Sequence, residues 1–175
     1  MTRHIRAHRI SLSLLAPALV FSLVACTTDG GAPSSTVTTD GGAPASTVLP
    51  IVSGASGAQP VLTAPKGEAP TELMIEDVIV GTGAKVTGKS AILVHYVLMG
   101  WTSGQVLETS WSAEPFTTTL DQVIPGWQQG IPGMKVGGRR LLVIPPSLGY
   151  GEQPIGGVAN ETLVFVVDLI GFRNL

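Results

Sequence analysis

The chain has 175 residues, with ten basic and twelve acidic side chains and a formal net charge of −2. Three of the basic residues precede residue 10, so from Cys26 onward seven basic and twelve acidic residues give a charge of −5. An acidic chain whose only adjacent basic pair is Arg139-Arg140 argues against nucleic acid as a partner. The single cysteine excludes an intramolecular disulfide.

The first 25 residues have the pattern of a secretory signal peptide. Three arginines and no acidic residue precede an almost wholly apolar run of sixteen residues, 10–25. A run of that length, which also contains Pro17, is shorter than the roughly 20 residues that span a bilayer. We therefore expect a signal peptide over residues 1–25, with an N-terminal anchor helix as the alternative.

The one cysteine, Cys26, directly follows this run in the sequence Leu-Val-Ala-Cys. The motif resembles the lipobox of bacterial lipoproteins, in which the cysteine is acylated on sulfur and becomes the mature N-terminus. Two or three acyl chains anchor a protein firmly, whereas a single chain binds only marginally. The resemblance implies an exported protein of the bacterial cell envelope, held to a membrane through Cys26 and facing outside the cytoplasm. Plain secretion with cleavage nearby is the alternative.

Residues 27–48 hold two copies of an eleven-residue repeat, TTDGGAPSSTV and TTDGGAPASTV, which differ only at Ser34 and Ala45. Gly, Pro, Ser and Thr dominate up to about Ala69, with few large apolar side chains. Such a segment buries too little apolar surface to offset the entropy that is lost on ordering. We expect residues 26–70 to be the lipidated cysteine and a disordered linker, with O-glycosylation of its Ser and Thr residues left open.

From residue 71 the sequence alternates between apolar segments and glycine-rich turns, which predicts short strands. The segments expected to form strands are residues 73–80, 91–99, 105–109, 116–120, 139–144 and 163–170. In the last segment the apolar residues alternate, so that they share one face while Asp168 lies on the other. A sheet of this kind needs a further element to cover its apolar face.

Residues 123–151 read VIPGWQQGIPGMKVGGRRLLVIPPSLGYG. They predict a one-turn helix that begins at Pro125, where a missing N–H costs nothing, and ends at Gly130. The stretch closely resembles the FKBP-type peptidyl-prolyl cis-trans isomerases, and the resemblance covers about residues 71–175. It implies an α+β fold in which an antiparallel sheet of about five strands curves around one short α-helix. It also implies an enzyme that acts on Xaa-Pro bonds.

By this resemblance Trp127 is the floor of a proline-binding pocket. Val123 and Ile124 line the rim, and the backbone N–H of Ile124 bonds to a substrate carbonyl. Tyr96, in the run Val-His-Tyr, matches a wall of the pocket. Tyr150, in Leu-Gly-Tyr-Gly, matches the tyrosine whose hydroxyl reaches the ligand. The remaining aromatic walls correspond to Phe116 and Phe165.

The chain departs from the family pattern in three places. At two positions of the pocket where the family usually has Phe-Asp, this chain has Leu107 and Glu108. Leucine keeps the pocket apolar with one ring fewer, and glutamate keeps the charge on a longer arm. The segment 120–122 is about two residues shorter than usual. Residues 152–161, EQPIGGVANE, stand where the family more often has an Ile-Pro-Pro run. The candidates for the apolar contact that this run would supply are Ile155 and Val158.

The expected site needs no nucleophile, metal or cofactor. Resonance that separates charge keeps the amide planar, with a rotation barrier of about 18–20 kcal/mol. A dry apolar pocket disfavours the charge-separated planar form relative to the twisted form, so differential binding supplies the catalysis. Amide rotation needs no proton transfer, which argues against acid–base chemistry by Glu108. His95 is expected to form structural hydrogen bonds, because it points away from Tyr96 along the strand.

Together these observations predict a lipid-anchored isomerase that binds proline-containing polypeptides and assists the folding of exported proteins. By resemblance, macrolides of the FKBP-ligand type are further ligands, and nothing in the sequence calls for more than a monomer. The main alternative is a non-catalytic module that holds proline-containing or unfolded chains, which the residues at 107 and 108 favour. An envelope adaptor with a vestigial pocket is a third reading.

Overall fold

The computed structural model describes residues 46–175 of the chain. The expected signal peptide, Cys26 and the repeat up to Ala45 lie outside these residues. Within the described part of the chain, no helix is long and apolar enough to cross a membrane. The residues that resemble the isomerase family all lie inside it.

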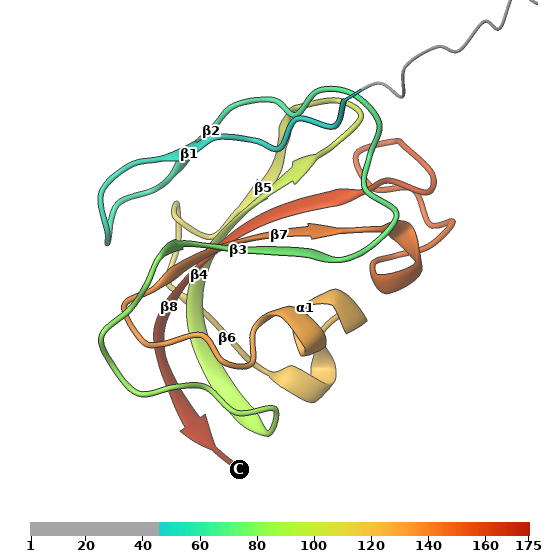
Figure 1. The fold of residues 1–175 in the computed structure, drawn as a ribbon. Helices are drawn as coiled ribbons and strands as arrows, with labels where there is room; N and C mark the ends of the chain where they lie inside the picture. The colour runs from blue at the N-terminus through green and yellow to red at the C-terminus, as the bar shows by residue number, and fades with distance from the viewer. Residues whose placement is uncertain (1–45) are drawn as a thin grey trace, which may run out of the picture. The chain divides into compact units, whose positions relative to one another are not determined.

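Six antiparallel strands form the main sheet, in the order β3-β7-β8-β4-β5 with β6 also paired to β4 (Figure 1). A separate two-stranded hairpin precedes the sheet in the chain. The strand bounds are Val52–Ser53 for β1, Val61–Leu62 for β2, Met74–Ile79 for β3, Ser90–Gly100 for β4, Val106–Thr109 for β5, Phe116–Thr119 for β6, Arg139–Ile144 for β7 and Leu163–Asn174 for β8.

The six strands of the main sheet fall on the six segments predicted to form strands. The sheet has one strand more than the five or so that the family resemblance implied, because β4 is long enough to pair with two short strands. Residues 91–94 of β4 pair with β6, and residues 97–99 pair with β5. Both short strands therefore lie along one edge of β4, while β8 pairs along its other edge. The predicted antiparallel sheet with one short helix is otherwise confirmed.

One α-helix, α1 (Pro125–Gly130), occurs in the described residues, as the sequence predicted. Two single-turn 3-10 helices also occur, at Leu120–Gln122 and Pro146–Leu148. Pro125 lies at the start of α1, and the carbonyl of Ile124 accepts the backbone N–H of Trp127 at 2.9 Å. A proline at this position removes only an N–H that has no partner inside the helix.

The helix packs directly on β7 because two of its residues have no side chain. A Cβ atom at Gly126 would collide with Ile144, and a Cβ atom at Gly130 would lie 2.7 Å from Leu142. This close approach brings Trp127, on the same turn, down onto the sheet, where only 3% of its surface stays exposed.

The two faces of the sheet carry separate apolar clusters. The face that α1 covers, here called the inner face, holds alternate residues of β8 such as Leu163, Phe165 and Val167. The opposite, outer face holds the residues between them, such as Val164 and Val166. Asp168 also belongs to the outer face, because it pairs with Arg139 across β7 and β8. The predicted alternation along this strand is therefore confirmed.

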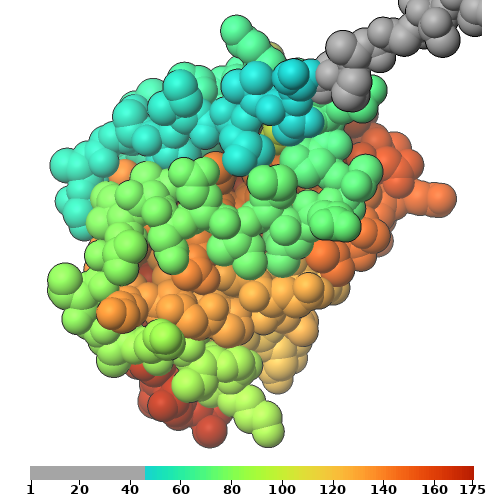
Figure 2. Space-filling view, in the orientation of Figure 1, coloured from blue at the N-terminus to red at the C-terminus, as the bar shows by residue number. Residues whose placement is uncertain are grey.

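An ordered segment covers the outer face. Residues 46–69, here called the N-terminal arm, form β1, β2 and a bridge between Val48 and Lys66. Leu49, Val52 and Leu62 of the arm pack against the outer cluster. Figure 1 shows the hairpin on the opposite side of the sheet from α1, and Figure 2 shows its cyan atoms along the top of the molecule. The disordered linker predicted up to residue 70 is therefore wrong for the arm.

A buried arginine ties the arm to the sheet. The guanidinium of Arg139, which is 1% exposed, makes a bidentate ion pair with Asp168 at 2.6 and 2.7 Å. Its remaining donors reach the carbonyls of Gly54 at 3.1 Å and Ala58 at 2.6 Å in the arm. A buried charge needs this kind of full pairing to be tolerated. The arm thus orders because the sheet offers it both apolar surface and two strong donors.

Candidate active site

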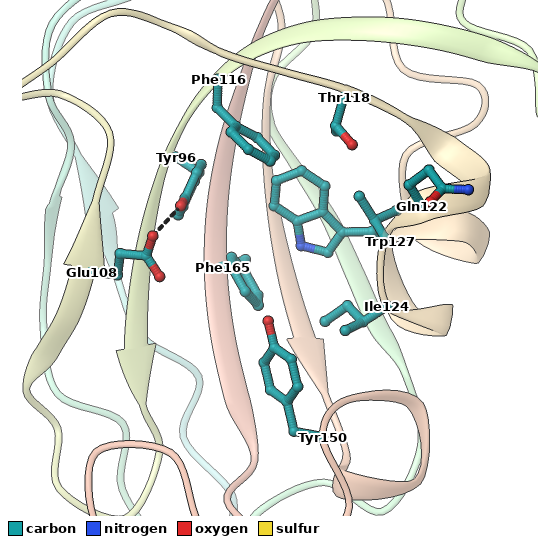
Figure 3. A pocket seen from close by; sticks show the side chains of 10 residues that line it. Tyr96, Glu108, Phe116, Thr118, Gln122, Ile124, Trp127, Tyr150 and Phe165 are labelled. Atoms are coloured by element: carbon teal, nitrogen blue, oxygen red, sulfur yellow. Dashed lines mark hydrogen bonds between the residues drawn. The ribbon is translucent and has the colours of Figure 1, made fainter. Parts of the chain in front are cut away.

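A cavity of about 350 Å³ opens on the inner face, between the sheet and α1. Eight of the nine pocket residues predicted from the resemblance line it, and the exception is Leu107. The close-up in Figure 3 shows aromatic rings from strands, from α1 and from a loop around this space. The residues that line the cavity are Tyr96, Glu108, Phe116, Thr118, Gln122, Val123, Ile124, Trp127, Tyr150 and Phe165.

Trp127 of α1 lies at the floor of the cavity, held by two rings that meet it edge to face. The centroid of Tyr96 lies 5.7 Å away at an interplanar angle of 84°, and that of Phe165 lies 5.2 Å away at 83°. T-shaped pairs of this kind are favoured because the positive edge of one ring meets the negative face of the other. The buried Nε1–H of Trp127 has no hydrogen-bond partner among the described residues.

Tyr96 and Glu108 form the polar side of the cavity. The Tyr96 hydroxyl donates to Glu108 Oε1 at 2.5 Å, a bond that the longer side chain of glutamate reaches from β5. Burial of the phenol raises the pKa of Tyr96, and the hydrogen bond and negative charge of Glu108 raise it further. Tyr96 therefore keeps its proton and stays a donor at physiological pH.

Two aromatic residues stand at the rim. Phe116 of β6 and Tyr150, in the segment after the Pro146–Leu148 turn, each expose 41% of their surface. Phe116 meets Tyr96 edge-on, with centroids 5.7 Å apart. Tyr150 enters from the other end, and its hydroxyl points toward Phe165 in Figure 3. An apolar ring at one end and a hydroxyl at the other suit a ligand with an apolar body and a carbonyl.

The residues that precede α1 complete the wall. Val123 and Ile124 are half-buried and line the cavity. The Val123 carbonyl accepts the side-chain amide of Gln128 at 2.8 Å. The backbone N–H of Ile124 donates to no acceptor within residues 46–175. It is therefore available to a ligand carbonyl, as the resemblance implied.

Two lining residues were missed at the level of sequence. Thr118 follows Phe116 by two positions on β6, so the alternation of a strand places both on one face. Gln122 ends the 3-10 turn that leads into Val123. The strand period would have identified Thr118, whereas nothing in the local sequence marks Gln122.

His95 lies away from the cavity, on the outer face. Its Nδ1 lies 3.0 Å from Ser110 Oγ, and its ring stacks on Trp111 with centroids 4.3 Å apart. The Ser110 hydroxyl oxygen also accepts the backbone N–H of Tyr96 at 2.8 Å. His95 thus makes the structural contacts that its position on the strand predicted.

The chemistry open to this cavity is that of binding and orientation. Among the described residues, its lining contains one carboxylate and no histidine, lysine or cysteine. No group of three His, Cys, Asp or Glu side chains in residues 46–175 is placed to hold a metal ion. What the lining does offer is apolar aromatic surface together with hydrogen-bond donors.

A curved antiparallel sheet, one short helix and an aromatic cavity between them define an α+β protein built to bind a small apolar group. The profile of the FKBP-type peptidyl-prolyl cis-trans isomerases matches residues 83–170. The chain therefore belongs to this family and is a peptidyl-prolyl cis-trans isomerase of the FKBP type.

The chain is similar to several members of the family along most of their length. A probable FK506-binding protein of Corynebacterium glutamicum is 44% identical over 114 residues, which are 64% of this chain and 97% of that protein. An FK506-binding protein of Streptomyces anulatus is 41% identical over 118 residues, covering 64% and 95% of the two chains.

Two crystal structures share the fold. That of FkpA from Escherichia coli has a TM-score of 0.55 and 34% identity, over 61% of this chain and 51% of that one. That of AtFKBP13 has a TM-score of 0.52 and 33% identity, over 60% of this chain and 96% of that one.

Proposed function

We propose that this isomerase acts on proline-containing polypeptides outside the bacterial cytoplasm, by stabilising the twisted Xaa-Pro amide in the cavity over Trp127. The uncatalysed isomerisation takes tens to hundreds of seconds and can limit the folding rate. An isomerase in the envelope would shorten this step for proteins that fold after export.

The observation that carries the proposal is the composition of the cavity. Five aromatic side chains and two aliphatic ones surround a space of about 350 Å³, and only Glu108 in the lining is charged. A planar amide is stabilised by charge separation, so transfer to apolar surroundings weakens the planar form more than the twisted one. The reaction then needs no covalent step.

Hydrogen bonds add to this effect if they favour the twisted amide. The unpaired N–H of Ile124 can bind the carbonyl of the substrate, and the Tyr150 hydroxyl lies at the far end of the cavity. The Tyr96 hydroxyl already donates to Glu108 and holds that carboxylate at the wall of the cavity. Preorganised donors cost no reorganisation when the amide rotates.

The proposal is tested with the purified protein and short proline peptides, by following the rate of cis-to-trans conversion. We expect acceleration over the uncatalysed rate, with competition by FK506, because curated relatives carry the name FK506-binding protein. Binding of the peptides without acceleration would instead support the non-catalytic module.

The proposed place in the envelope rests on the sequence before residue 46. The basic start, the apolar run and Leu-Val-Ala-Cys support export and acylation of Cys26. Growth of the native host with labelled palmitate should label the wild-type protein and leave Cys26→Ser unlabelled. An unlabelled wild type, or a labelled variant, would remove the anchor from the proposal.

A further inference from the structure

The strand β3 lies at one edge of the main sheet and has a free side. It pairs with β7 alone, and no backbone hydrogen bond joins it to the arm or to any other segment of residues 46–175. The free side of an edge strand presents unpaired backbone N–H and C=O groups. An extended chain can bind to these groups as a further strand of the sheet.

Large apolar side chains are exposed along β3 and on the arm beside it. Met74 and Ile75 of β3 expose 40% and 48% of their surface, and Ile51 of the arm exposes 68%. The arm packs mainly against outer-face residues of β4, β7 and β8, so the first four residues of β3 stay exposed. Figure 2 shows green atoms of the segment that holds β3 next to the cyan atoms of the arm. An exposed apolar patch of this kind is typical of a surface that binds another chain.

Two adjacent cavities, of about 180 and 270 Å³, lie between the arm and β3. Leu49 of the arm, Glu76 of β3 and Leu141 of β7 line both of them. Met74 lines only the first cavity, and Val78 lines only the second. Glu76 is the single charged residue in either lining. Since Glu76 stands between Met74 and Val78 in the strand, its carboxylate lies between two apolar cavities.

The charge at this edge is negative and has no partner on the outer face. No ion pair in residues 46–175 includes Glu76, whereas Asp77 pairs with Arg140 on the inner face. Four of the twelve acidic residues of the chain lie between positions 68 and 77, with no basic residue among them. Like charges on facing strands are destabilising, so this edge disfavours an acidic strand, such as a second β3, and attracts a basic one.

We propose that the free edge of β3 and the two cavities beside it form a second binding site, which takes an extended, basic and apolar segment of an unfolded polypeptide as an added strand. Every second side chain of such a strand lies on the outer face, next to Met74, Glu76 and Val78. The segment that fits has an apolar residue, Lys or Arg two positions later, and an apolar residue two positions after that. Backbone pairing supplies affinity, and these three side chains supply selectivity.

The inference goes beyond the proposed function, because binding at β3 needs neither a proline nor catalysis in the cavity over Trp127. The two sites would cooperate on one substrate only when a single chain holds both a proline and a basic, apolar segment. Such a chain bound at β3 would keep its proline at a raised effective concentration near the isomerase cavity.

The test uses a fluorescent peptide without proline, Thr-Leu-Thr-Lys-Thr-Leu-Thr, in which Leu, Lys and Leu share one face when the peptide is extended. Fluorescence anisotropy follows its binding to the full-length protein. We expect saturable binding that an excess of a short proline peptide does not displace. Absence of binding would overturn the inference, and so would displacement by the proline peptide, which would place the probe in the inner cavity.

The contribution of Glu76 is tested by charge reversal. Glu76→Lys should weaken binding of the Lys probe about five- to tenfold, because it replaces an attraction at an exposed site by a repulsion. It should also tighten binding of a matched probe with Glu in place of Lys. Glu72→Lys is the control, since Glu72 is exposed, lines neither cavity and gives the same change in net charge. Equal losses in the two variants would indicate diffuse attraction to an acidic protein and would refute the site.

The added strand is tested on the peptide, so that the protein stays unchanged. Alternate residues of a strand direct their N–H groups to opposite edges. N-methylation of the Leu and Lys residues therefore blocks one edge of the probe, and N-methylation of the Thr residues between them blocks the other. One form should lose binding and the other should keep it. Equal affinity of the two forms, whether high or low, would refute strand addition.

A second copy of the chain is the competing occupant of this edge. Sedimentation velocity at the protein concentrations of the binding assay should show a monomer, with and without the probe. A dimer that the probe dissociates would assign the edge to a second copy and overturn the proposed partner. Isomerisation of short proline peptides should be the same in Glu76→Lys and wild type, which separates failure of this site from failure of the proposed function.

Discussion

Both faces of the main sheet are covered by other parts of the chain, but the two coverings differ in how they use hydrogen-bond donors. On the inner face α1 leaves a cavity of about 350 Å³, and the N–H of Ile124 and Nε1–H of Trp127 have no partner in the described residues. On the outer face the arm lies on the sheet, and Arg139 uses its guanidinium donors on Asp168 and two arm carbonyls. Unpaired buried donors reduce stability. The inner face thus keeps hydrogen-bonding capacity for a ligand, and the outer face uses it to hold the fold.

The largest expected effect is a difference in kcat/KM between the alanine variants of two tryptophans, one on each face of the sheet. Trp127→Ala should lower kcat/KM about 100-fold, equivalent to about 2.7 kcal/mol of transition-state binding, because it removes the cavity floor. Trp101→Ala on the outer face should leave kcat/KM unchanged. Trp101 is 7% exposed and its Nε1–H donates to the Gly67 carbonyl at 3.2 Å.

Both substitutions should cost about 3–5 kcal/mol of stability, as is usual for a buried tryptophan. Activities are therefore compared per folded molecule, with the folded fraction taken from near-UV circular dichroism. Equal loss of activity in the two variants would contradict the division between the faces.

The next effect is a difference in stability between variants of two adjacent arginines, whose side chains point to opposite faces of the sheet. Arg139→Met leaves Asp168 buried without its partner and should cost about 3–5 kcal/mol in urea unfolding. Arg140, on the inner face, pairs with Asp77, whose side chain is 42% exposed, and donates to the Gly130 carbonyl at the end of α1. Arg140→Met should cost less, about 1–2 kcal/mol.

Limited proteolysis distinguishes the two arginine variants further. Cleavage within residues 46–69 should become faster in Arg139→Met, because the arm loses both of the hydrogen bonds that its carbonyls accept from the guanidinium. Arg140→Met should leave the arm protected and instead lower turnover through a looser α1. Protection of the arm in both variants would mean that apolar contacts alone hold it.

The inner face could be predicted from sequence because its motif is local and chemically distinctive. Pro125, Gly126 and Gly130 around Trp127 allow only a short helix that packs closely on a strand. The position of Leu107 could not be predicted in this way. Its direction depends on a bulge in the pairing of β5 with β4, and a strand pattern read along one chain does not show such a bulge.

The outer face was missed for a different physical reason. Residues 46–69 have the small, polar composition of a linker, and their few apolar side chains cannot fold alone. These residues become ordered because Leu49, Val52 and Leu62 pack on an apolar surface that β7 and β8 already form. The composition of a segment indicates how much apolar surface the segment can bury by itself. It does not indicate how much apolar surface a neighbouring sheet presents to that segment.

A smaller effect is expected from one polar contact on each face. Tyr150→Phe removes a hydroxyl from an exposed rim residue, so it should lower kcat/KM by about two- to tenfold, the worth of one hydrogen bond, without changing stability. His95→Ala removes the stack on Trp111 and the bond to Ser110, so it should cost about 1 kcal/mol and leave kcat/KM unchanged. Loss of activity in a folded His95→Ala protein would contradict its structural role.

The smallest effect concerns pH and the Tyr96–Glu108 pair. Burial, and then the hydrogen bond and charge of Glu108, raise the pKa of Tyr96 above its ordinary value near 10. Below that pH both the folded and the unfolded chain hold the phenolic proton, so this group adds no pH dependence to the stability and its contribution is fully present. Above pH 10 the unfolded chain loses the proton first, and the stability contributed by Tyr96 should fall as the pH rises toward its folded pKa.

Urea unfolding from pH 8 to pH 11 measures this fall as the difference between wild type and Tyr96→Phe, which cancels the titration of lysines. Glu108→Gln keeps an acceptor for the Tyr96 hydroxyl but removes the charge. The fall of the unfolding free energy above pH 10 should therefore be shallower in this variant than in the wild type. An unchanged slope would show that burial and the hydrogen bond raise the pKa of Tyr96 without help from the charge of Glu108. In that case Glu108 would serve the cavity as a hydrogen-bond acceptor, with no contribution from its charge.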